Sequence, residues 1–343
     1  MARKISRYGW RPDVPDVRDF RYAAPRAVLA ALPPSADLSS GCPPVYDQMT
    51  LGSCTSNAIN AAHQFEQIKQ DATKAFIPSR LFVYFNEREM EGSVNEDSGA
   101  EIRDGIKSVV NLGVCPETLW PYDISRFTQK PPDQCYQDAL DHQVVAYQRI
   151  DQTSDPIRTL QQMKGCLADG YPFVFGFTVY DSFESKEVTE SGELNMPQPG
   201  ESVQGGHAVL AIGYDDATQR FLVRNSWGEK WGLKGYFTIP YAYLTDSNLS
   251  ADFWTIRMVE VSEHSEPEPQ PFPPNPEPEP SPCDWSLLFP ATKAFADAAV
   301  AHADMSKKVG GGVSASGDRI LEAGLRGLQI YLQRVGQVRT RRR

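Results

Sequence analysis

The sequence predicts an α+β protein made of two lobes. Segments with helical composition fill the chain between residues 54 and 113, whereas the segments after residue 143 are rich in aromatic and β-branched residues, with turn residues between them. Because helices precede strands instead of alternating with them, the two kinds of element should segregate into separate lobes. The chain has 343 residues and is 41% apolar, enough for one large or two modest domains.

The N-terminal part, residues 1–31, is a basic arm rich in Pro, Arg and Asp. Up to about residue 36 it shows neither a helical nor a strand period, so we expect an extended segment with short turns. From residue 32 onward the chain is typical of a globular domain, which we place at residues 32–262. Its first half should contain three helices, at residues 54–69, 78–91 and 98–113, and Gly113 provides a C-cap for the third.

The second half of this domain should supply the strands. Four short segments have the composition of strands bounded by turns: residues 171–180, 207–215, 220–227 and 234–240. Beyond them, residues 263–283 form a Pro/Glu-rich linker, with nine prolines in residues 263–282, which favours a stiff polyproline-like spacer.

The last part, residues 284–343, is predicted to be a helical and basic tail. Residues 291–306 and 318–336 have helical composition, and the second segment carries an apolar stripe of Leu321, Leu325, Leu328, Leu332 and Val335. Such a helix suits a membrane surface or a partner's groove, although a small self-packed helical hairpin would show the same pattern. We expect the tail to be dispensable for catalysis.

Charge and cysteine spacing exclude several function classes. Residues 1–31 carry about +4, residues 32–283 about −19 and residues 284–343 about +5. An acidic body argues against a nucleic-acid-binding groove. The six cysteines include no C-x-x-C pair, so zinc or thioredoxin-type chemistry has no support. With neither an apolar run of about twenty residues nor a Sec signal peptide, we expect a soluble monomer, cytoplasmic or exported by another route.

Cys54 is a candidate nucleophile. It directly follows the turn-forming Leu51-Gly52-Ser53 and begins the first predicted helix. At a helix N-terminus, unpaired N–H groups and the helix dipole favour a thiolate. The alternative is a core cysteine, because free Cys is among the most buried residue types.

A thiolate nucleophile needs a base, and His207 is the best candidate among the five histidines. His63 lies nine residues after Cys54 in the same helix and therefore on the opposite face. His142 lies in a polar linker, and His264 and His302 lie in the spacer and the tail. His207 opens an apolar strand directly after Gly205 and Gly206, which let another segment approach closely. A hydrogen-bonded core histidine is the alternative.

Two further groups complete a catalytic set. Asn225 ends a buried strand, and holding an imidazole ring would satisfy its amide, with Trp227 covering that hydrogen bond. Gln48, six residues before Cys54, could donate to an oxyanion together with the Cys54 N–H. The alternatives are an ordinary turn with a core tryptophan, and a turn glutamine.

At these positions the sequence resembles the papain-like cysteine peptidases of the cathepsin group and its bacterial relatives. The resemblance rests on DQMTLGSC, GGHAVLAIGYDD and RNSWGEKWGLKGYF, which stand in the family's order, and it covers about residues 32–262. It implies a cysteine endopeptidase that acts on proteins or peptides without metal or cofactor, in a fold with a helical left lobe, a strand-rich right lobe and the active site between them.

The resemblance also implies residue roles. Cys54 matches the nucleophile, His207 the base and acid, Asn225 the group that orients it and Gln48 the oxyanion donor. Ser98 and Gly99 match the stretch that hydrogen-bonds the extended substrate. Gly205 and Gly206 should leave a roomy pocket before His207, with Phe173, Phe175 or Phe177 lining it and Trp227 nearby.

Three departures from the family pattern qualify these roles. Thr55 replaces the aromatic residue that usually follows the nucleophile, Leu51 replaces a cysteine of a nearby disulfide, and the long helical propeptide is absent. Cys54 should be free, and any bridge would involve Cys42. The basic arm, residues 1–31, is expected to act as a short inhibitory pro-segment. A transferase or ligase that uses the same thioester, and a catalytically silent binding module, remain alternatives.

Overall fold

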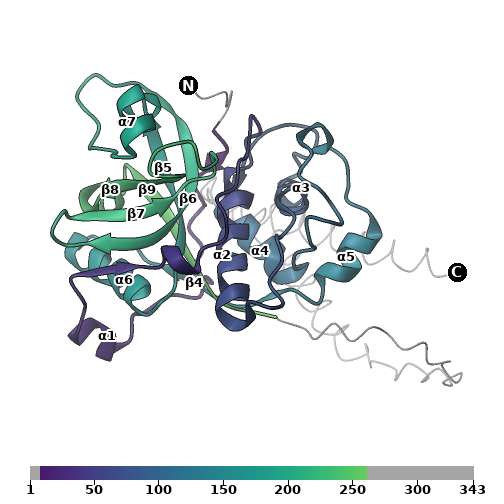
Figure 1. Ribbon diagram of the computed structural model, residues 1–343, viewed down its shortest axis with the longest axis horizontal. Helices are drawn as coiled ribbons and strands as arrows, with labels where there is room; N and C mark the ends of the chain where they lie inside the picture. Colours follow the sequence, from purple (N-terminus) through teal and green to yellow (C-terminus); the bar gives the residue numbers. More distant parts are fainter. Residues whose placement is uncertain (1–7, 261–343) are drawn as a thin grey trace, which may run out of the picture. The chain divides into compact units, whose positions relative to one another are not determined.

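A long buried helix, α2 (Cys54–Asp71), lies between the helices of residues 80–139 and a seven-stranded sheet in the computed structural model, which describes residues 8–260 (Figure 1). The helix contains neither Gly nor Pro, and its small residues Ala58, Ala61 and Ala62 are buried. Alanine side chains let a helix approach its neighbours closely and cost no side-chain entropy in a helix. The first turn of α2 is thereby held against the sheet.

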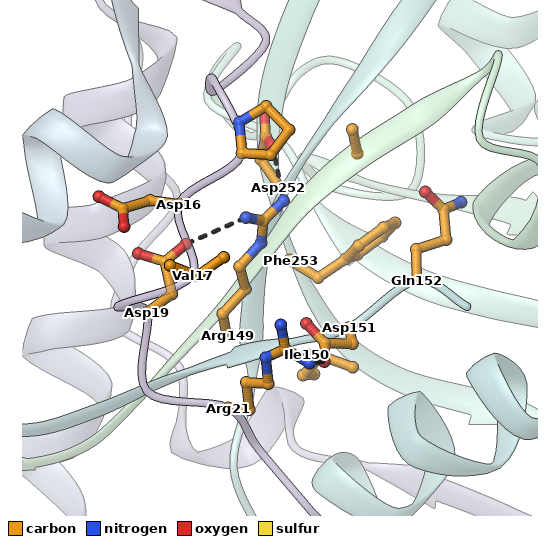
Figure 2. Close-up of a pocket in the computed structure, with 12 residues that line it drawn as sticks. Asp16, Val17, Asp19, Arg21, Arg149, Ile150, Asp151, Gln152, Asp252 and Phe253 are labelled. Carbon is orange, nitrogen blue, oxygen red and sulfur yellow. Dashed lines mark hydrogen bonds and ion pairs between the residues drawn. The ribbon is translucent and has the colours of Figure 1, made fainter.

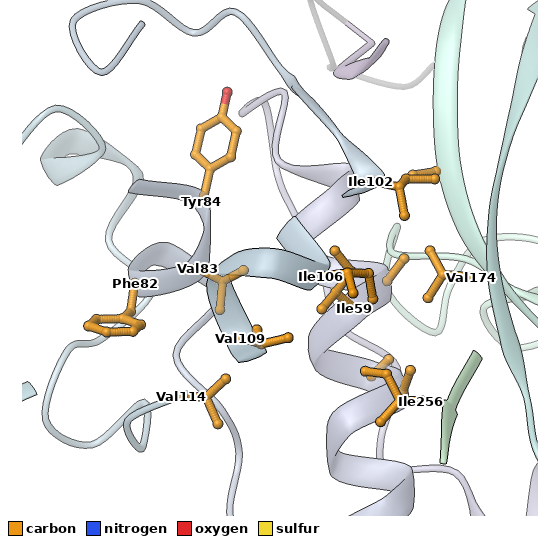
Figure 3. Packing of buried hydrophobic residues seen from close by; sticks show 14 of the residues in the cluster. Ile59, Phe82, Val83, Tyr84, Ile102, Ile106, Val109, Val114, Val174 and Ile256 are labelled. Atoms are coloured by element: carbon orange, nitrogen blue, oxygen red, sulfur yellow. The ribbon is translucent and has the colours of Figure 1, made fainter. Parts of the chain in front are cut away.

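The helical lobe packs on the far side of α2. It contains α3 (Arg80–Glu91), α4 (Ile102–Asn111) and α5 (Asp133–Ala139). Figure 3 shows how its core is filled: Ile59 of α2 meets Ile106 and Val109 of α4, and Val174 and Ile256 of the sheet lie close to them. The same apolar cluster therefore joins this lobe to the sheet.

The strand-rich lobe is an antiparallel sheet in the order β4-β9-β5-β6-β7-β8, with β2 paired to β6. A separate two-stranded parallel pair joins β1 to β3. The strands are β1 (Trp10–Arg11), β2 (Ser35–Asp37), β3 (Ala100–Glu101), β4 (Val144–Ile150), β5 (Phe173–Tyr180), β6 (Val203–Asp215), β7 (Arg220–Arg224), β8 (Tyr236–Pro240) and β9 (Ser250–Val259).

A second apolar cluster fills the other face of this sheet. Alternation along β5 sends Phe173, Phe175 and Phe177 into that cluster, whereas Val174 belongs to the cluster shared with α2. Among the described residues, the remaining helices are α1 (Arg26–Ala30), α6 (Pro156–Ala168), α7 (Lys186–Ser191), α8 (Tyr241–Thr245) and the 3₁₀ turns at Ser39–Gly41, Ile124–Arg126 and Asp181–Glu184.

The α+β, two-lobed prediction is confirmed, but several elements differ from expectation. The arm contains a short helix, α1, where only extended chain was expected. The helix expected from residue 98 begins at Ile102, because Gly99 has a φ of 67° and the next two residues pair as β3. The second half also contains α6, and the strands β4 and β9 were not expected. Gly113 does follow the end of α4 with a φ of 74°.

The cysteines within the described residues carry free thiols: Cys42, Cys54, Cys115, Cys135 and Cys166. No helix in the described part of the chain is long and apolar enough to cross a membrane. The predictions for the linker at 263–283 and the tail at 284–343, together with Cys283, lie outside the described residues.

Candidate active site

Cys54 is the first residue of α2 and is fully buried. Its Sγ accepts hydrogen bonds from the backbone N–H groups of Ala208 on β6, of Gly9 in the arm and of Thr55. Burial raises the pKa of this thiol to about 11, against the opposing effect of those three donors. In this state the sulfur is therefore held as a thiol, although it stands at a helix N-terminus.

His207 lies on β6 next to Ala208, whose backbone N–H contacts Cys54 Sγ. The imidazole ring of His207 is held by Asn225. The His207 Nε2–H donates to Asn225 Oδ1 at 2.8 Å, and the same oxygen accepts the Ser226 N–H at 2.9 Å. Because a carbonyl oxygen only accepts, the proton must lie on Nε2, which leaves Nδ1 as the nitrogen able to take a proton. The backbone of Asn225 follows β7 directly and is itself fixed by a bond to Gly235 O.

Aromatic rings surround this imidazole. Trp227 lies with its ring centroid 5.1 Å from that of His207, and Phe177 and Phe183 lie at 5.8 Å and 6.1 Å. Trp227 and Asn225 are both buried. The rings exclude water from the His207–Asn225 hydrogen bond, which strengthens it.

Gln48 lies in the loop before Cys54, and that loop is tied to the Asn225–Trp227 segment. Gln48 N donates to Ser226 O, and its Oε1 accepts the Ser226 hydroxyl at 2.6 Å. Its Nε2 donates one hydrogen to Leu51 O at 2.9 Å. An amide nitrogen carries two hydrogens, so the second hydrogen of Gln48 Nε2 is not used by the bond to Leu51 O. The structure thus brings Gln48 into one network with Asn225, with its side chain locked at both ends.

The N-terminal arm runs directly past Cys54 and through the region predicted to bind substrate. Gly9 O accepts the Ala100 N–H at 2.7 Å, and β1 pairs with β3 next to Gly99. A Cβ added at Gly9 would lie 1.7 Å from Gly52 O, and one added at Gly99 would lie 2.0 Å from Gly9 O. The arm and the helical lobe therefore touch backbone to backbone.

On the opposite side the arm meets the predicted glycine pair of β6. A Cβ at Gly205 would lie 2.8 Å from the Tyr8 side chain, and one at Gly206 would lie 2.4 Å from Trp10 O. Ser98 directly precedes Gly99 in the chain. Its hydroxyl is hydrogen-bonded to the Ser93 hydroxyl and donates to Gly99 O. Of the expected binding residues, Gly99, Gly205 and Gly206 thus border the arm, and the ring centroid of Trp227 lies 6.3 Å from that of Tyr8 in the arm.

Beyond these contacts, acidic residues of the arm bind two arginines, the buried Arg103 and the partly buried Arg149. Asp19 forms ion pairs with Arg103 at 2.7 Å and Arg149 at 3.0 Å. Asp13 Oδ1 accepts the Arg103 N–H and its Oδ2 accepts the indole N–H of Trp254. These contacts fasten the arm to both lobes, because Arg103 belongs to α4 and Arg149 to β4.

Sequence reasoning missed Asp252, a buried carboxylate on β9 that contacts the arm. It accepts the indole N–H of Trp10 at 3.1 Å and the backbone N–H of Asp13 at 2.8 Å. One acidic residue within the apolar run of residues 250–259 was the available signal. The expectation that Phe173, Phe175 and Phe177 line the substrate pocket is wrong, since they point into the core on the other face.

The two other histidines within residues 8–260, His63 and His142, lie in packed surroundings. His63 Nε2 bonds to His142 O at 3.0 Å, and the ring of His142 lies against Phe76. No group of three or more His, Cys, Asp or Glu side chains within residues 8–260 is placed to hold a metal ion.

A family model described as "Papain family cysteine protease" matches residues 32–250. An uncharacterized peptidase C1-like protein of Acanthamoeba polyphaga mimivirus is 50% identical over 215 residues, covering 62% of this chain and 69% of the viral protein. The thiol protease aleurain of Arabidopsis thaliana is 29% identical over 234 residues, which span 61% of this chain and 56% of aleurain.

Among solved structures, xylellain, a cysteine protease from Xylella fastidiosa, superimposes with a TM-score of 0.68 and 46% identity, over 75% of this chain and 98% of xylellain. A procathepsin B of Trypanosoma congolense reaches a TM-score of 0.60 at 18% identity, covering 74% of this chain and 87% of that one. The second likeness concerns the fold alone.

Proposed function

Because the chain belongs to the papain family of cysteine proteases, we propose that it hydrolyses peptide bonds of proteins or peptides through a thioester on Cys54. The observation that supports this best is the buried His207–Asn225 hydrogen bond of 2.8 Å, which orients the ring and makes Nδ1 the proton-accepting nitrogen of His207, on the strand that contacts Cys54 Sγ. A base oriented in this way is what a thiol nucleophile requires.

The first half of the reaction forms the acyl-enzyme. His207 takes the Cys54 proton, and the thiolate attacks the carbonyl carbon of the substrate, so that a C–S bond forms and the carbonyl oxygen becomes an oxyanion. The Cys54 N–H and the remaining hydrogen of Gln48 Nε2 stabilise that oxyanion. His207 then gives its proton to the nitrogen of the leaving amine as the C–N bond breaks.

The second half releases the acid. A water molecule gives one proton to His207 and attacks the thioester carbon, and the C–S bond breaks as the sulfur takes the proton back. Asn225 keeps the imidazole ring in one orientation through both halves, and its oxygen stabilises the imidazolium through the Nε2–H. The aromatic cover of Trp227 keeps bulk water from competing for this hydrogen bond.

We further propose that the chain is made in a self-inhibited form, with the arm as inhibitor. The arm blocks the cleft at the nucleophile itself, because Gly9 contacts both Cys54 Sγ and the backbone of Gly52 and Gly99. The bond at Gly9 is not cut in place, since the arm presents an N–H to the sulfur while the Gly9 carbonyl is turned away and bonded to Ala100 N–H at 2.7 Å. Burial, which outweighs the effect of the Gly9 N–H on the pKa of Cys54, also keeps the thiol protonated.

The free energy that holds the arm against the lobes should become less favourable as the pH rises toward about 7, because Asp252 titrates in this range. Burial, and next the charge of Asp13, raise the pKa of Asp252 from 3.8 to about 7 while the arm is bound. Once the arm leaves, Asp13 and the arm's cover leave with it, so the open form binds the proton less tightly. A group whose pKa is raised in the docked state stabilises that state at low pH and loses this contribution above its docked pKa.

This pH dependence can be measured without activity, in the full chain carrying Cys54→Ala. We expect an added serine protease to cut residues 8–13 faster at pH 8 than at pH 6, by up to about tenfold, which corresponds to the one pH unit between 6 and the docked pKa of about 7. The same measurement on Cys54→Ala with Asp252→Asn corrects for the protease's own pH profile. Equal ratios in the two proteins would contradict the role of Asp252 titration.

The proposed chemistry is tested by a peptide probe that carries a thiol-reactive group. We expect it to modify one cysteine, found by mass spectrometry to be Cys54, and to leave the Cys54→Ala chain unmodified. Product analysis with an added amine separates hydrolysis from acyl transfer. Labelling spread over several cysteines, with no peptide hydrolysis, would instead favour a catalytically silent binding module.

A further inference from the structure

Thr55 and Glu87 form a buried hydrogen bond directly beside the nucleophile. Thr55 is the second residue of α2, so it follows Cys54 in the chain, and its hydroxyl donates to Glu87 Oε1 of α3 at 2.6 Å. Both side chains are fully buried. The backbone N–H of Thr55 also contacts Cys54 Sγ. One residue thus joins the sulfur to a carboxyl group that the proposed mechanism does not use.

The carboxyl group of Glu87 is held differently from buried carboxylates elsewhere in the chain. Figure 2 shows the Arg149 guanidinium between Asp19 and Asp252, with N···O distances of 3.0 Å and 3.6 Å. The arginine that follows Glu87 in α3, Arg88, donates instead to the backbone carbonyl groups of Tyr84, Val94, Glu96 and Phe127. The second oxygen of Glu87, Oε2, has no hydrogen-bond partner within residues 8–260.

These surroundings keep Glu87 as an uncharged acid. Its Oε2 faces Gly105 of α4, where an added Cβ would lie only 2.7 Å away, so the glycine makes room for this oxygen. Burial raises the pKa of Glu87 well above 4.5, and the Thr55 hydroxyl lowers it by less. The other charged groups that act on the carboxyl from α3 and α4 are Glu91 and Asp104, which raise this pKa further, and Arg88, which lowers it.

An uncharged carboxyl group suits a position beside a thiolate. Besides burial, which has the larger effect, a negative charge on Glu87 raises the pKa of Cys54 and so disfavours the thiolate. The unpartnered Oε2 destabilises the fold, and groups kept at such a cost are commonly found at functional sites. Thr55 also stands where an aromatic residue usually follows the nucleophile. A ring would be held there by packing, whereas the small threonine side chain is held by its hydrogen bond.

We propose that Glu87 is a positioning residue: as an uncharged acid it fixes Thr55, and with it the first turn of α2, from which Cys54 attacks the substrate. The proposal rests on the proposed peptidase function and adds a residue that acts on the same site. Loss of the hydrogen bond frees the turn that carries the sulfur and the N–H of Cys54, so the attack and the stabilisation of the oxyanion both lose their geometry. The effect should therefore appear in kcat and not in KM.

Thr55→Val removes the donor of this hydrogen bond and keeps the shape of the side chain. In the full chain we expect kcat on a peptide substrate to fall about tenfold or more, with KM within about a factor of two. Thr55→Ser, which keeps the hydroxyl, should hold kcat to within about threefold of the unaltered chain. Glu87→Leu should match Thr55→Val, whereas Glu87→Gln, which keeps an oxygen acceptor, should match Thr55→Ser.

Tyr136→Phe is the matched control. Tyr136 donates to Asn86 Oδ1 at 2.9 Å, so the substitution also removes one hydrogen bond to α3, at the residue before Glu87, but not one to α2. It should leave kcat and KM within about a factor of two. A loss of kcat in Tyr136→Phe as large as in Thr55→Val would show a general loosening of α3 and overturn the positioning role.

Thermal unfolding tests the uncharged state of Glu87 without any need for activity. In the unfolded chain Glu87 ionises near its ordinary pKa of 4.5, and in the folded chain it does not, so a rising pH favours the unfolded chain. Glu87→Gln escapes this penalty, and its Tm should gain about 3 °C or more relative to the unaltered chain between pH 5 and pH 8. A Tm difference that is the same at both pH values would show that Glu87 is charged in the folded chain and overturn the proposal.

Alkylation of Cys54 separates this inference from the proposed function. The rate at which iodoacetamide modifies Cys54 at pH 7, followed by mass spectrometry, should fall about threefold or more in Thr55→Val and in Glu87→Leu. Cutting of residues 8–13 by an added protease shows whether the arm opens equally in each protein. If alkylation and Tm follow this pattern while the unaltered chain hydrolyses no peptide, the positioning role stands and the peptidase proposal fails. If hydrolysis occurs and Thr55→Val lowers neither kcat nor the alkylation rate, the positioning role is overturned.

Discussion

Replacing Cys54 by alanine is expected to abolish peptide hydrolysis while leaving the chain folded. The substitution keeps the Cβ at the first position of α2 and removes only the sulfur, whose partners are three backbone N–H groups. Loss of a nucleophile that works together with its base costs about four orders of magnitude or more in kcat. His207→Ala should be equally severe, and Cys54→Ser nearly so, because an imidazole alone does not ionise a hydroxyl. The rates are measured on a peptide substrate, with circular dichroism and Tm as controls for folding.

Asn225→Ala provides the graded comparison within this series. It leaves Cys54 and His207 in place but removes the oxygen 2.8 Å from His207 Nε2. The loss should be smaller than for either deletion, and the pH profile of kcat should shift, because the imidazolium loses its acceptor. Unaltered activity in a folded Cys54→Ala chain would refute the thioester mechanism.

The candidate site was largely predictable because its residues lie in short sequence blocks that carry their own geometry. Cys54 follows a turn and starts a helix, and Asn225 directly ends a strand, so each is placed by local structure. The pairing of His207 with Asn225 is set by antiparallel β6 and β7, which are close in sequence. Contacts between segments that are close in sequence can be predicted from the residue pattern of those segments.

The parts that could not be predicted depend on contacts between distant segments. Strand β4 pairs with β9, and the alternation expected of a half-buried strand is weak in β4 because arm residues cover part of it: Arg149 N donates to Phe20 O. The role of Asp252 becomes apparent only from its hydrogen bonds with Trp10 and Asp13, which lie about 240 residues earlier in the chain. Strand parity in β5 was likewise set by the core, which takes the phenylalanines and leaves Gly176 facing the arm.

The arm itself was predicted from charge and composition, and the structure divides its described part in two. Residues 8–13 lie against Gly52, Gly99 and the glycine pair of β6, whereas Tyr22 and Ala24 are buried in the apolar cluster of the strand-rich lobe. Removing residues 1–31, which would start the chain near Leu32, would therefore also strip packing from that lobe and leave Arg103 without Asp19. Single substitutions within residues 8–13 of the full chain test inhibition by the arm without removing the packing of Tyr22 and Ala24.

Weakening the first part of the arm is expected to raise the initial rate of the full chain on a small peptide substrate. Trp10→Ala removes a buried indole and its bond to Asp252, and truncating a buried Trp costs about 3–5 kcal/mol in a protein core. Each 1.4 kcal/mol shifts the docked-to-open ratio tenfold, so we expect an increase of at least about thirtyfold. Gly9→Ala should have a similar effect, because its Cβ cannot fit against Gly52 O.

Arg18→Ala is the control, since Arg18 lies in the second part of the arm, is highly exposed and pairs only with Asp16 among the ion pairs of the described residues. It should leave the rate unchanged. Higher salt should also speed the unaltered chain, because the attraction between an arm of about +4 and a domain of about −14 is screened. Rates that are the same for the unaltered chain, Trp10→Ala and Gly9→Ala, with residues 1–31 intact by mass spectrometry, would show that the arm does not inhibit. A rate that rises with time as the unaltered chain trims its own arm would support inhibition, because covalent removal of Gly9 and Trp10 then does what their substitution does.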